Sequence, residues 1–140
     1  MVEKIRFVDA NIFLEVFLQD ARWEEARDFL EKLSKGDLEG ITTDYIIFSI
    51  LLQIENKKKS TKEMKDFVAF LGNMKGLKIA HFTLGILMKA MSVMENYGLD
   101  FDDALEAAYM LALDISEIVS FDRDFDRVKG IKRVEPREII

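Results

Sequence analysis

The 140-residue sequence contains no cysteine and a single histidine. The lack of cysteine excludes disulfide bonds and zinc–thiolate sites, and it favours a cytoplasmic protein. Because no second histidine exists to complete a ligand pair, we expect His81 to be a partly buried structural residue. The longest apolar stretch, residues 45–52, is interrupted by Ser49 and is too short to span a bilayer. The N-terminus has no basic-then-apolar leader, so we expect no signal peptide.

Positive charge is also scarce, since 20 Lys and Arg residues stand against 26 Asp and Glu residues and leave a net charge of −6. Proteins that coat nucleic acid by bulk phosphate neutralisation are usually basic, so this class is disfavoured. A metal-dependent nuclease is not, because it concentrates carboxylates around its cations. The one strong basic run contains Lys57, Lys58, Lys59, Lys62 and Lys65. Such a run is more often a solvated helix junction than an RNA-contacting patch.

Segments with the periodicities of strands and helices alternate along the chain. We predict strands at residues 4–8, 40–42, 77–80, 118–121 and 132–134. We predict helices at residues 10–17, 21–34, 44–56, 61–71, 83–97 and 101–113. Thr43 or Asp44 is expected to cap the third helix, and Ser60 the fourth. This alternation predicts a single α/β domain over residues 1–140, with a central parallel sheet of four to five strands and helices on both faces.

Three aspartates follow this pattern in a way that suggests a site. Asp9 and Asp122 each come directly after a predicted strand, and Asp103 lies near the start of the helix before the strand at 118–121. Ligands of open α/β sheets collect beyond the carboxyl ends of the strands. An acid after a strand is, taken alone, more often a helix cap. Three acids in these positions, without histidine or cysteine nearby, point to Mg²⁺ or Mn²⁺.

The segments around these acids resemble the motifs of one known family. Residues 7–14, FVDANIFL, are similar to the opening of PIN domains, an apolar strand followed by Asp, a small residue, and Asn or Ser. Residues 99–105, LDFDDAL, are similar to their later motif, in which an aspartate precedes Ala-Leu on a helix. Residues 118–125, IVSFDRDF, are similar to their closing motif, a strand, Thr or Ser, an Asp, and Asp-Phe. The chain therefore resembles PIN-domain proteins of the VapC type over its whole length.

The resemblance implies a metal-dependent ribonuclease that hydrolyses RNA phosphodiester bonds and often acts as the toxin of a toxin–antitoxin pair. It implies that Asp9, Asp103 and Asp122 bind Mg²⁺ or Mn²⁺ and carry catalysis, with Asp124 assisting. Supporting roles are expected for Asn11, Ser49, Ser120 and Glu106. The implied partners are an RNA substrate, an antitoxin protein and a second copy of the chain in a homodimer, and no membrane partner is expected.

The sequence departs from the family at one acid. PIN domains of this type carry a glutamate in the helix after the second strand, and Ser49 occupies that position here. Glu55 is six residues further on, about 120° around the helix, so it cannot substitute. Gln53 shares the face of Ser49 but is neutral. Glu106, one turn after Asp103, is the better candidate for a compensating acid.

Several alternatives stay open at this stage. The serine at position 49 favours a binding module that holds a protein partner or RNA without efficient cleavage. A phosphatase with an aspartate nucleophile is weakened because its usual second acid, two positions after Asp9, is Asn11. Asn11 itself is expected to cap a helix or to orient a metal-bound water. Apolar residues beyond the needs of a core, on the early and middle helices, suggest a dimer face or a groove for a partner helix. We expect three methionines at helical spacing, Met88, Met91 and Met94, to pack in the core.

Overall fold

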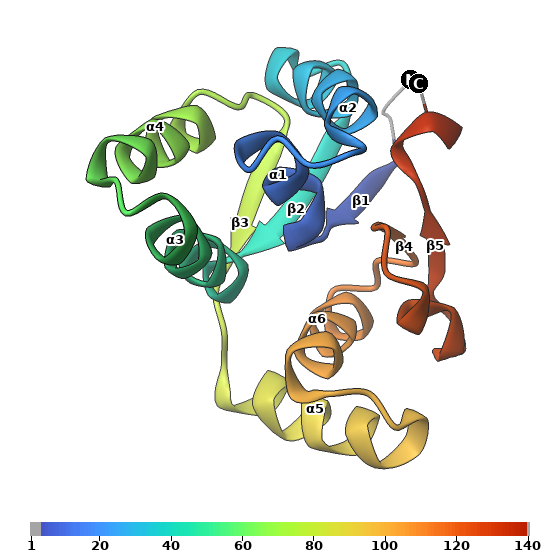
Figure 1. Ribbon diagram of the computed structural model, residues 1–140. Coiled ribbons are helices and arrows are strands. Elements are labelled where there is room, and N and C mark those ends of the chain that lie inside the picture. The colour runs from blue at the N-terminus through green and yellow to red at the C-terminus, as the bar shows by residue number, and fades with distance from the viewer. Residues whose placement is uncertain (1–3, 140) are drawn as a thin grey trace.

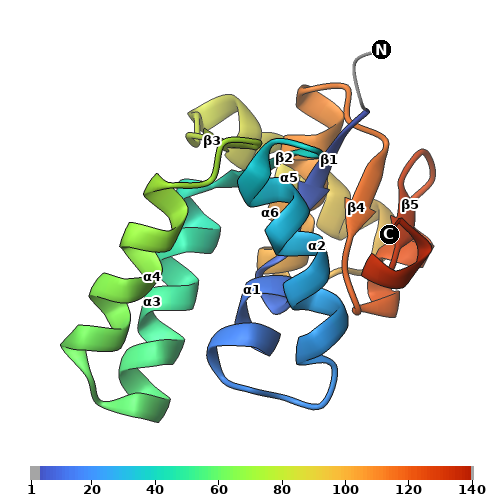
Figure 2. The ribbon, with the colours of Figure 1, turned by 90° about the horizontal axis from the view of Figure 1, so that it is seen from above.

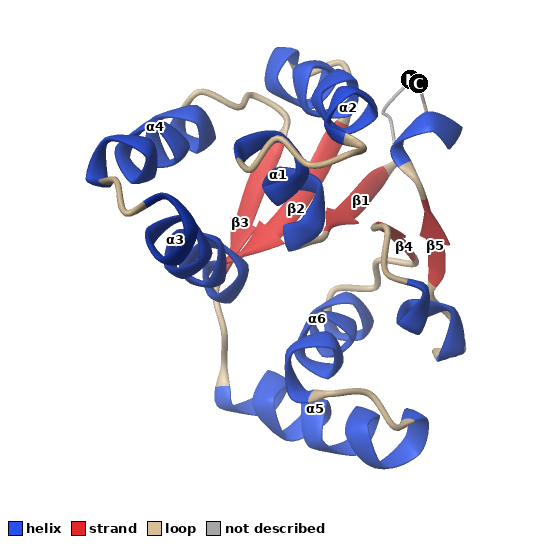
Figure 3. Cartoon of the chain, in the orientation of Figure 1, coloured by secondary structure: helices blue, strands red, loops and turns tan. Residues whose placement is uncertain are grey.

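The computed structural model describes residues 4–139 and contains one five-stranded sheet in that range. All neighbouring strands are parallel, in the order β3-β2-β1-β4-β5 (Figure 3). The strands are β1 (Ile5–Val8), β2 (Glu39–Thr43), β3 (Leu77–Ala80), β4 (Glu117–Val119) and β5 (Lys132–Val134). The predicted α/β class and parallel sheet are thereby confirmed.

Helices cover both faces of this sheet, as predicted (Figures 1 and 2). Their bounds are α1 (Ala10–Phe17), α2 (Trp23–Lys35), α3 (Asp44–Lys58), α4 (Thr61–Gly72), α5 (Leu84–Tyr97) and α6 (Phe101–Ala112). The chain moves from β1 to β3 with α1 to α4 on one side, and then crosses to β4 with α5 and α6 on the other. Right-handed crossovers require this change of face when the direction of strand addition reverses.

Local signals in the sequence account for most helix ends. Thr43 is the N-cap of α3 and accepts a hydrogen bond at Oγ1 from the amide of Ile46, at 3.1 Å. Ser60 caps α4 in the same way, accepting from the amide of Glu63 at 3.2 Å. Gly98 ends α5 with a φ of 68°, a left-handed conformation that glycine adopts without strain. Thr43 is thus the cap of the third helix, rather than Asp44.

Strand β4 is shorter than predicted because two side chains take over its hydrogen bonds. The sequence predicts a strand to Phe121, but β4 ends at Val119. The amide of Ser120 still donates to the carbonyl of Val134, at 3.1 Å. The amide of Phe121 instead donates to the side-chain oxygen of Asn11, at 3.3 Å. The backbone therefore turns away from the sheet at the position where the predicted site begins.

The core lies between the sheet and the two helical layers. Phe7, Val8, Ile118 and Val119 of the central strands are fully buried. A second part of the core joins α1 to α4 through edge-to-face aromatic contacts, with ring centroids 5.1 to 6.0 Å apart. The aromatic residues are Phe13, Phe17, Phe67 and Phe70. None of the helices within residues 4–139 is both long and apolar enough to cross a membrane.

Two sequence-based expectations about burial are wrong. The side chain of His81 is 76% exposed, and its Nδ1 lies 3.3 Å from Oδ2 of Asp44. Met88 and Met91 are 70% and 41% exposed, and only Met94 packs against the core. The helical spacing of the methionines does place them near one another on α5. No element within residues 4–139 covers that face, so the spacing could not predict burial.

Candidate metal centre

The candidate site lies where the direction of strand addition changes. Strand β1 occupies the centre of the sheet and pairs with β2 on one side and β4 on the other. The last residues of β1 and β4, Val8 and Val119, are paired in register. The residues after them, Asp9 and then the Ser120–Asp122 segment, must therefore leave the sheet side by side. This is the switch point at which open α/β sheets form their ligand crevice.

Asp9 is held by four hydrogen bonds, although it is only 5% exposed. Its backbone amide donates to the carbonyl of Val119 at 3.1 Å. As the N-cap of α1, it accepts at Oδ1 from the amide of Ala10 at 2.7 Å. Its Oδ2 accepts from the Ser120 hydroxyl at 2.5 Å and from the Asn11 amide at 3.1 Å. Burial nevertheless raises the pKa of Asp9, and the nearby charge of Asp122 adds to this.

Ser120 and Asn11 connect Asp9 to the segment that carries Asp122. The Ser120 oxygen accepts from the amide of Asp122 at 3.0 Å and from the Asn11 side chain at 3.2 Å. The Asn11 oxygen in turn accepts from the amide of Phe121. Because Asp9 is the N-cap, the expectation that Asn11 caps α1 is wrong. Asn11 and Ser120 instead fix the positions of the two strand-end aspartates relative to each other.

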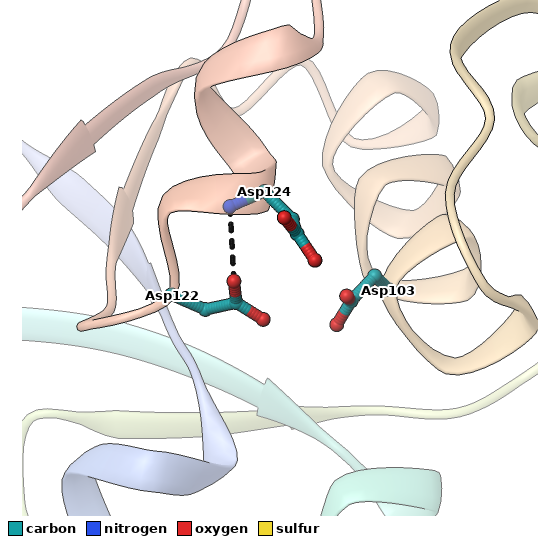
Figure 4. Close-up of side chains that lie close together, drawn as sticks. All are labelled: Asp103, Asp122 and Asp124. Atoms are coloured by element: carbon teal, nitrogen blue, oxygen red, sulfur yellow. Dashed lines mark hydrogen bonds between the residues drawn. The ribbon is translucent and has the colours of Figure 1, made fainter.

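A second group of aspartates comes together from α6 and the 3₁₀ helix η1 (Arg123–Arg127). Each of Asp103, Asp122 and Asp124 offers a carboxylate oxygen, and these oxygens lie within 4.8 Å of one another. Figure 4 shows Asp103 pointing from α6 toward the other two. Oδ1 of Asp122 accepts from the amide of Asp124 at 2.9 Å. Burial and the charges of Asp122, Asp102 and Asp9 raise the pKa of Asp103 to about 7.

A pocket of about 190 Å³ joins most of the predicted site residues. Its lining residues are Asp9, Ala10, Asn11, Leu14, Tyr45, Ile46, Ser49, Gln53, Asp102, Asp103, Glu106 and Asp122. Ser120 is fully buried and supports Asp9, while Asp124 reaches the site through its contact with Asp103 and Asp122. Glu55 is exposed and is not among the lining residues, as its position on α3 predicts.

Sequence reasoning missed Asp102 and Tyr45 as parts of this pocket. Asp102 directly precedes Asp103 and lies one helical turn before Glu106, so its spacing could have placed it here. Its charge also contributes to raising the pKa of Tyr45, after the effect of burial. Tyr45 follows the predicted cap of a helix and carries no motif. It could have been placed only by knowing that α3 and α6 face each other across the pocket.

The comparison with protein families bears on this site. A family model described as the PIN domain matches residues 6–131. The chain belongs to the PIN domain family. The match includes every residue of the strand-end site, from Asp9 to Asp124. Among curated proteins, no relative matches the sequence.

Solved structures share this PIN-domain fold at low sequence identity. VapC20 of Mycobacterium tuberculosis, described as a toxin that cleaves the sarcin–ricin loop, is 19% identical with a TM-score of 0.75. The match covers 95% of this chain and 100% of VapC20. VapBC2 of Rickettsia felis, bound to a DNA fragment from its promoter, is 18% identical over 94% of this chain and 98% of the other, with a TM-score of 0.72. At these identities the likeness concerns the fold.

A toxin–antitoxin complex from Klebsiella pneumoniae is a third similar structure. It is 19% identical with a TM-score of 0.68, over 94% of this chain and 97% of the other. All three of these PIN-domain relatives are thus matched over nearly their whole length. The fold of this chain is the fold of VapC toxins and of the toxins in VapBC complexes.

Proposed function

We propose that this PIN domain is an endoribonuclease that depends on Mg²⁺ or Mn²⁺ and serves as the toxin of a VapBC-type toxin–antitoxin pair. The observation that carries the proposal is the meeting of Asp9, Asp103 and Asp122 at one pocket beyond the carboxyl ends of β1 and β4. Each comes from a different element, so the fold itself, rather than local sequence, gathers the charge. Such gathering costs free energy unless a cation or donor compensates it.

The residues present fit a hard divalent cation. All the candidate ligands are carboxylate oxygens, which Mg²⁺ and Mn²⁺ prefer over nitrogen or sulfur. Asp9, Asp103 and Asp122 would hold the ion, with Asp124 assisting. When bound, such an ion activates water and neutralises charge on a phosphodiester. Burial and neighbouring acids raise the pKa of Asp103 to about 7, which is the electrostatic condition that a bound cation relieves.

The protein's own residues would orient this site. Ser120 and Asn11 both donate to Oδ2 of Asp9, so this oxygen is already engaged within the protein. Oδ1 of Asp9 accepts from Ala10 at the start of α1. The lone pairs that remain free on these oxygens are those available to an ion in the pocket. The hydrogen bonds fix the carboxylate in a single orientation before any ion binds, which reduces the cost of ordering it.

The substrate and partner belong to the proposal as well. VapC20 is described as cleaving an RNA loop, and two other similar structures are toxin–antitoxin complexes. These descriptions support RNA as the substrate and an antitoxin protein as the partner of this chain. A cytoplasmic location would bring the enzyme to cellular RNA, and the absence of cysteine agrees with it.

Incubation with a structured RNA should give specific cleavage that requires a divalent cation. We expect discrete products with Mn²⁺ or Mg²⁺, and no products after chelation by EDTA, because the carboxylates alone cannot neutralise the phosphate. Gel analysis of end-labelled RNA measures the result, and a single-stranded DNA of the same sequence is the matched control. Cleavage that continues in EDTA would contradict the proposed chemistry.

A binding module without efficient cleavage is the second candidate function. The observation in its favour is the wall that α3 contributes to the pocket, where Ser49 and Gln53 are both neutral. The retained Asp9, Asp103 and Asp122 favour the enzyme, because a site that binds no metal gains nothing from clustered charge. Binding of RNA with the same affinity in Mn²⁺ and in EDTA, without products, would support the binding module.

We also propose a homodimer, with an apolar surface formed by α3, α5 and the residues that start α5 and α6. A cleft of about 280 Å³ there is lined by Asp44, Tyr45, Phe48, Phe82, Leu87, Phe101 and Leu105. Phe48 is 62% exposed, and Phe82, Leu84 and Met88 are exposed beside it. A second copy would bury these side chains, and contiguous exposed apolar residues of this kind mark interaction surfaces.

The replacement Phe82→Asp should weaken the dimer by about tenfold or more, since it would bury a charge in an apolar interface. Light scattering over a concentration series measures the mass. Val68→Asp is the matched control, because Val68 is also exposed but lies on α4. A monomeric mass for the unmodified chain at all concentrations would remove the homodimer from the proposal.

A further inference from the structure

The wall of the metal pocket formed by α3 carries no charge. Ser49, at the position where the family has a glutamate, lines the pocket and is partly buried. Gln53, one turn later, also lines it and is neutral. The nearby acid on this helix, Glu55, is exposed and lies outside the lining. The side of the pocket that supplies a carboxylate in the family therefore supplies amide and hydroxyl groups here.

The opposite wall carries an acid that the family motif does not require. Glu106 lies one turn after Asp103 on α6, so the two side chains project from the same face of the helix. Glu106 is only 4% exposed, yet it lines the same pocket as Asp9 and Asp103. Its Oε1 has no hydrogen-bond partner among the residues that the structure describes. The rest of this buried stretch of α6 is apolar or aromatic: Ala104, Leu105, Ala107, Ala108, Tyr109 and Met110.

A purely structural role does not explain this side chain. A buried acid without a donor is costly to the fold, and an apolar residue would suit the neighbours of Glu106 better. Burial, and then the adjacent charge of Asp9, raise the pKa of Glu106 well above its ordinary range. A proton shared between the Glu106 and Asp9 carboxyl groups makes the arrangement tolerable without a cation. It gives no reason for an acid to be there.

We infer that Glu106 supplies the fourth carboxylate of the metal centre, from α6, in place of the family glutamate that Ser49 replaces on α3. The inference rests on the proposed metal site and names a ligand within it. The pocket then holds four buried or partly buried acids, Asp9, Asp103, Glu106 and Asp122, all on the side formed by β1, β4 and α6. The fourth acid has moved across the pocket, and the number of acids has been kept.

Calorimetric titration with Mn²⁺ tests this assignment. Glu106→Gln should weaken Mn²⁺ binding by about tenfold or more, because the amide keeps the shape but loses the charge. The same variant should melt at a higher temperature than the unmodified chain in EDTA, since it removes an unpaired buried acid. Glu106→Leu serves as a second variant that suits the apolar surroundings. Glu55→Gln is the matched control and should leave both quantities unchanged.

A transplant of the carboxylate separates this role from a general charge effect. Ser49→Glu alone should change Mn²⁺ binding by less than about threefold, because the fourth charge is already present. In the Glu106→Gln background the same change should restore most of the lost affinity. An independent readout uses the unmodified chain with ¹³C-labelled glutamate carboxyl groups. Substoichiometric Mn²⁺ should broaden one glutamate signal selectively, because Glu106 is the one glutamate lining the pocket among residues 4–139.

The failures of the two proposals are distinguishable. If the unmodified chain binds no Mn²⁺, or Asp9→Asn binds it equally well, the metal site itself is wrong. If Asp9→Asn loses Mn²⁺ while Glu106→Gln and Glu106→Leu bind it as tightly as the unmodified chain, only the role of Glu106 is wrong. A large gain in affinity from Ser49→Glu alone would also overturn it, because the fourth position would then have been vacant.

Discussion

Asp9→Asn should abolish RNA cleavage and remove the stabilisation of the fold by Mn²⁺. An ion that binds only the folded chain stabilises it by mass action, by about 2.7 kcal/mol at a concentration one hundred times its dissociation constant. For a chain of this size we expect a rise in melting temperature of about 8 °C. Asparagine keeps an oxygen for the amide of Ala10 at the start of α1, so the helix cap survives. The negative charge that attracts the ion does not survive.

Melting in EDTA distinguishes this effect from damage to the fold. Burial raises the pKa of Asp9, so the neutral asparagine should leave the apo protein as stable as before, or more stable. Differential scanning calorimetry with and without Mn²⁺ gives both numbers. Asp66→Asn is the matched control, since Asp66 lies on α4 and pairs only with the exposed Lys62. An equal Mn²⁺ response in Asp9→Asn and in the unmodified chain would disprove the site.

The fold followed closely from the sequence because its signals are local. The helix at 10–17 and the strands at 77–80 and 132–134 were predicted with the bounds that the structure has. Caps such as Thr43 and Ser60 act through hydrogen bonds to residues three positions on, which a sequence displays directly. The early end of β4 was not predictable in this way. It depends on Asn11, which is 110 residues away from Phe121 in the chain.

The candidate site was predictable only in part, for the same physical reason. Strand ends and the order of parallel strands place Asp9 and Asp122 together, and the helix before β4 brings Asp103 to them. The hydroxyl of Ser120, which contacts Asp9, Asn11 and the amide of Asp122, could not be seen as a junction from its position in a motif. Burial of single side chains was the least predictable feature. His81 and Met88 are exposed because no element within residues 4–139 covers them.

The apo protein should lose stability as the pH rises from about 4 to about 7. The pKa of Asp103 is raised from 3.8 to about 7 in the folded chain, so the folded chain keeps a proton that the unfolded chain releases above about pH 4. Asp9 and Glu106 shift in the same direction. Glu135 shifts the opposite way, to about 2, because it pairs with Arg22 and Arg133. Its contribution is lost only in stronger acid, so it does not mask the trend.

Mn²⁺ binding should show the reverse dependence and tighten over the same pH range. Each proton that the ion must displace weakens binding by about tenfold per pH unit below the pKa of the group that holds it. We therefore expect at least about a tenfold gain in affinity between pH 5.5 and pH 7.5. Melting temperatures in EDTA and calorimetric titrations at matched pH values measure the two trends. Asp103→Asn should flatten the first, and Asp66→Asn should leave both as they are. Apo stability that instead rises with pH across this range would show that the acids of the pocket do not hold protons in the folded chain, and that their charge is balanced by some group other than a metal ion.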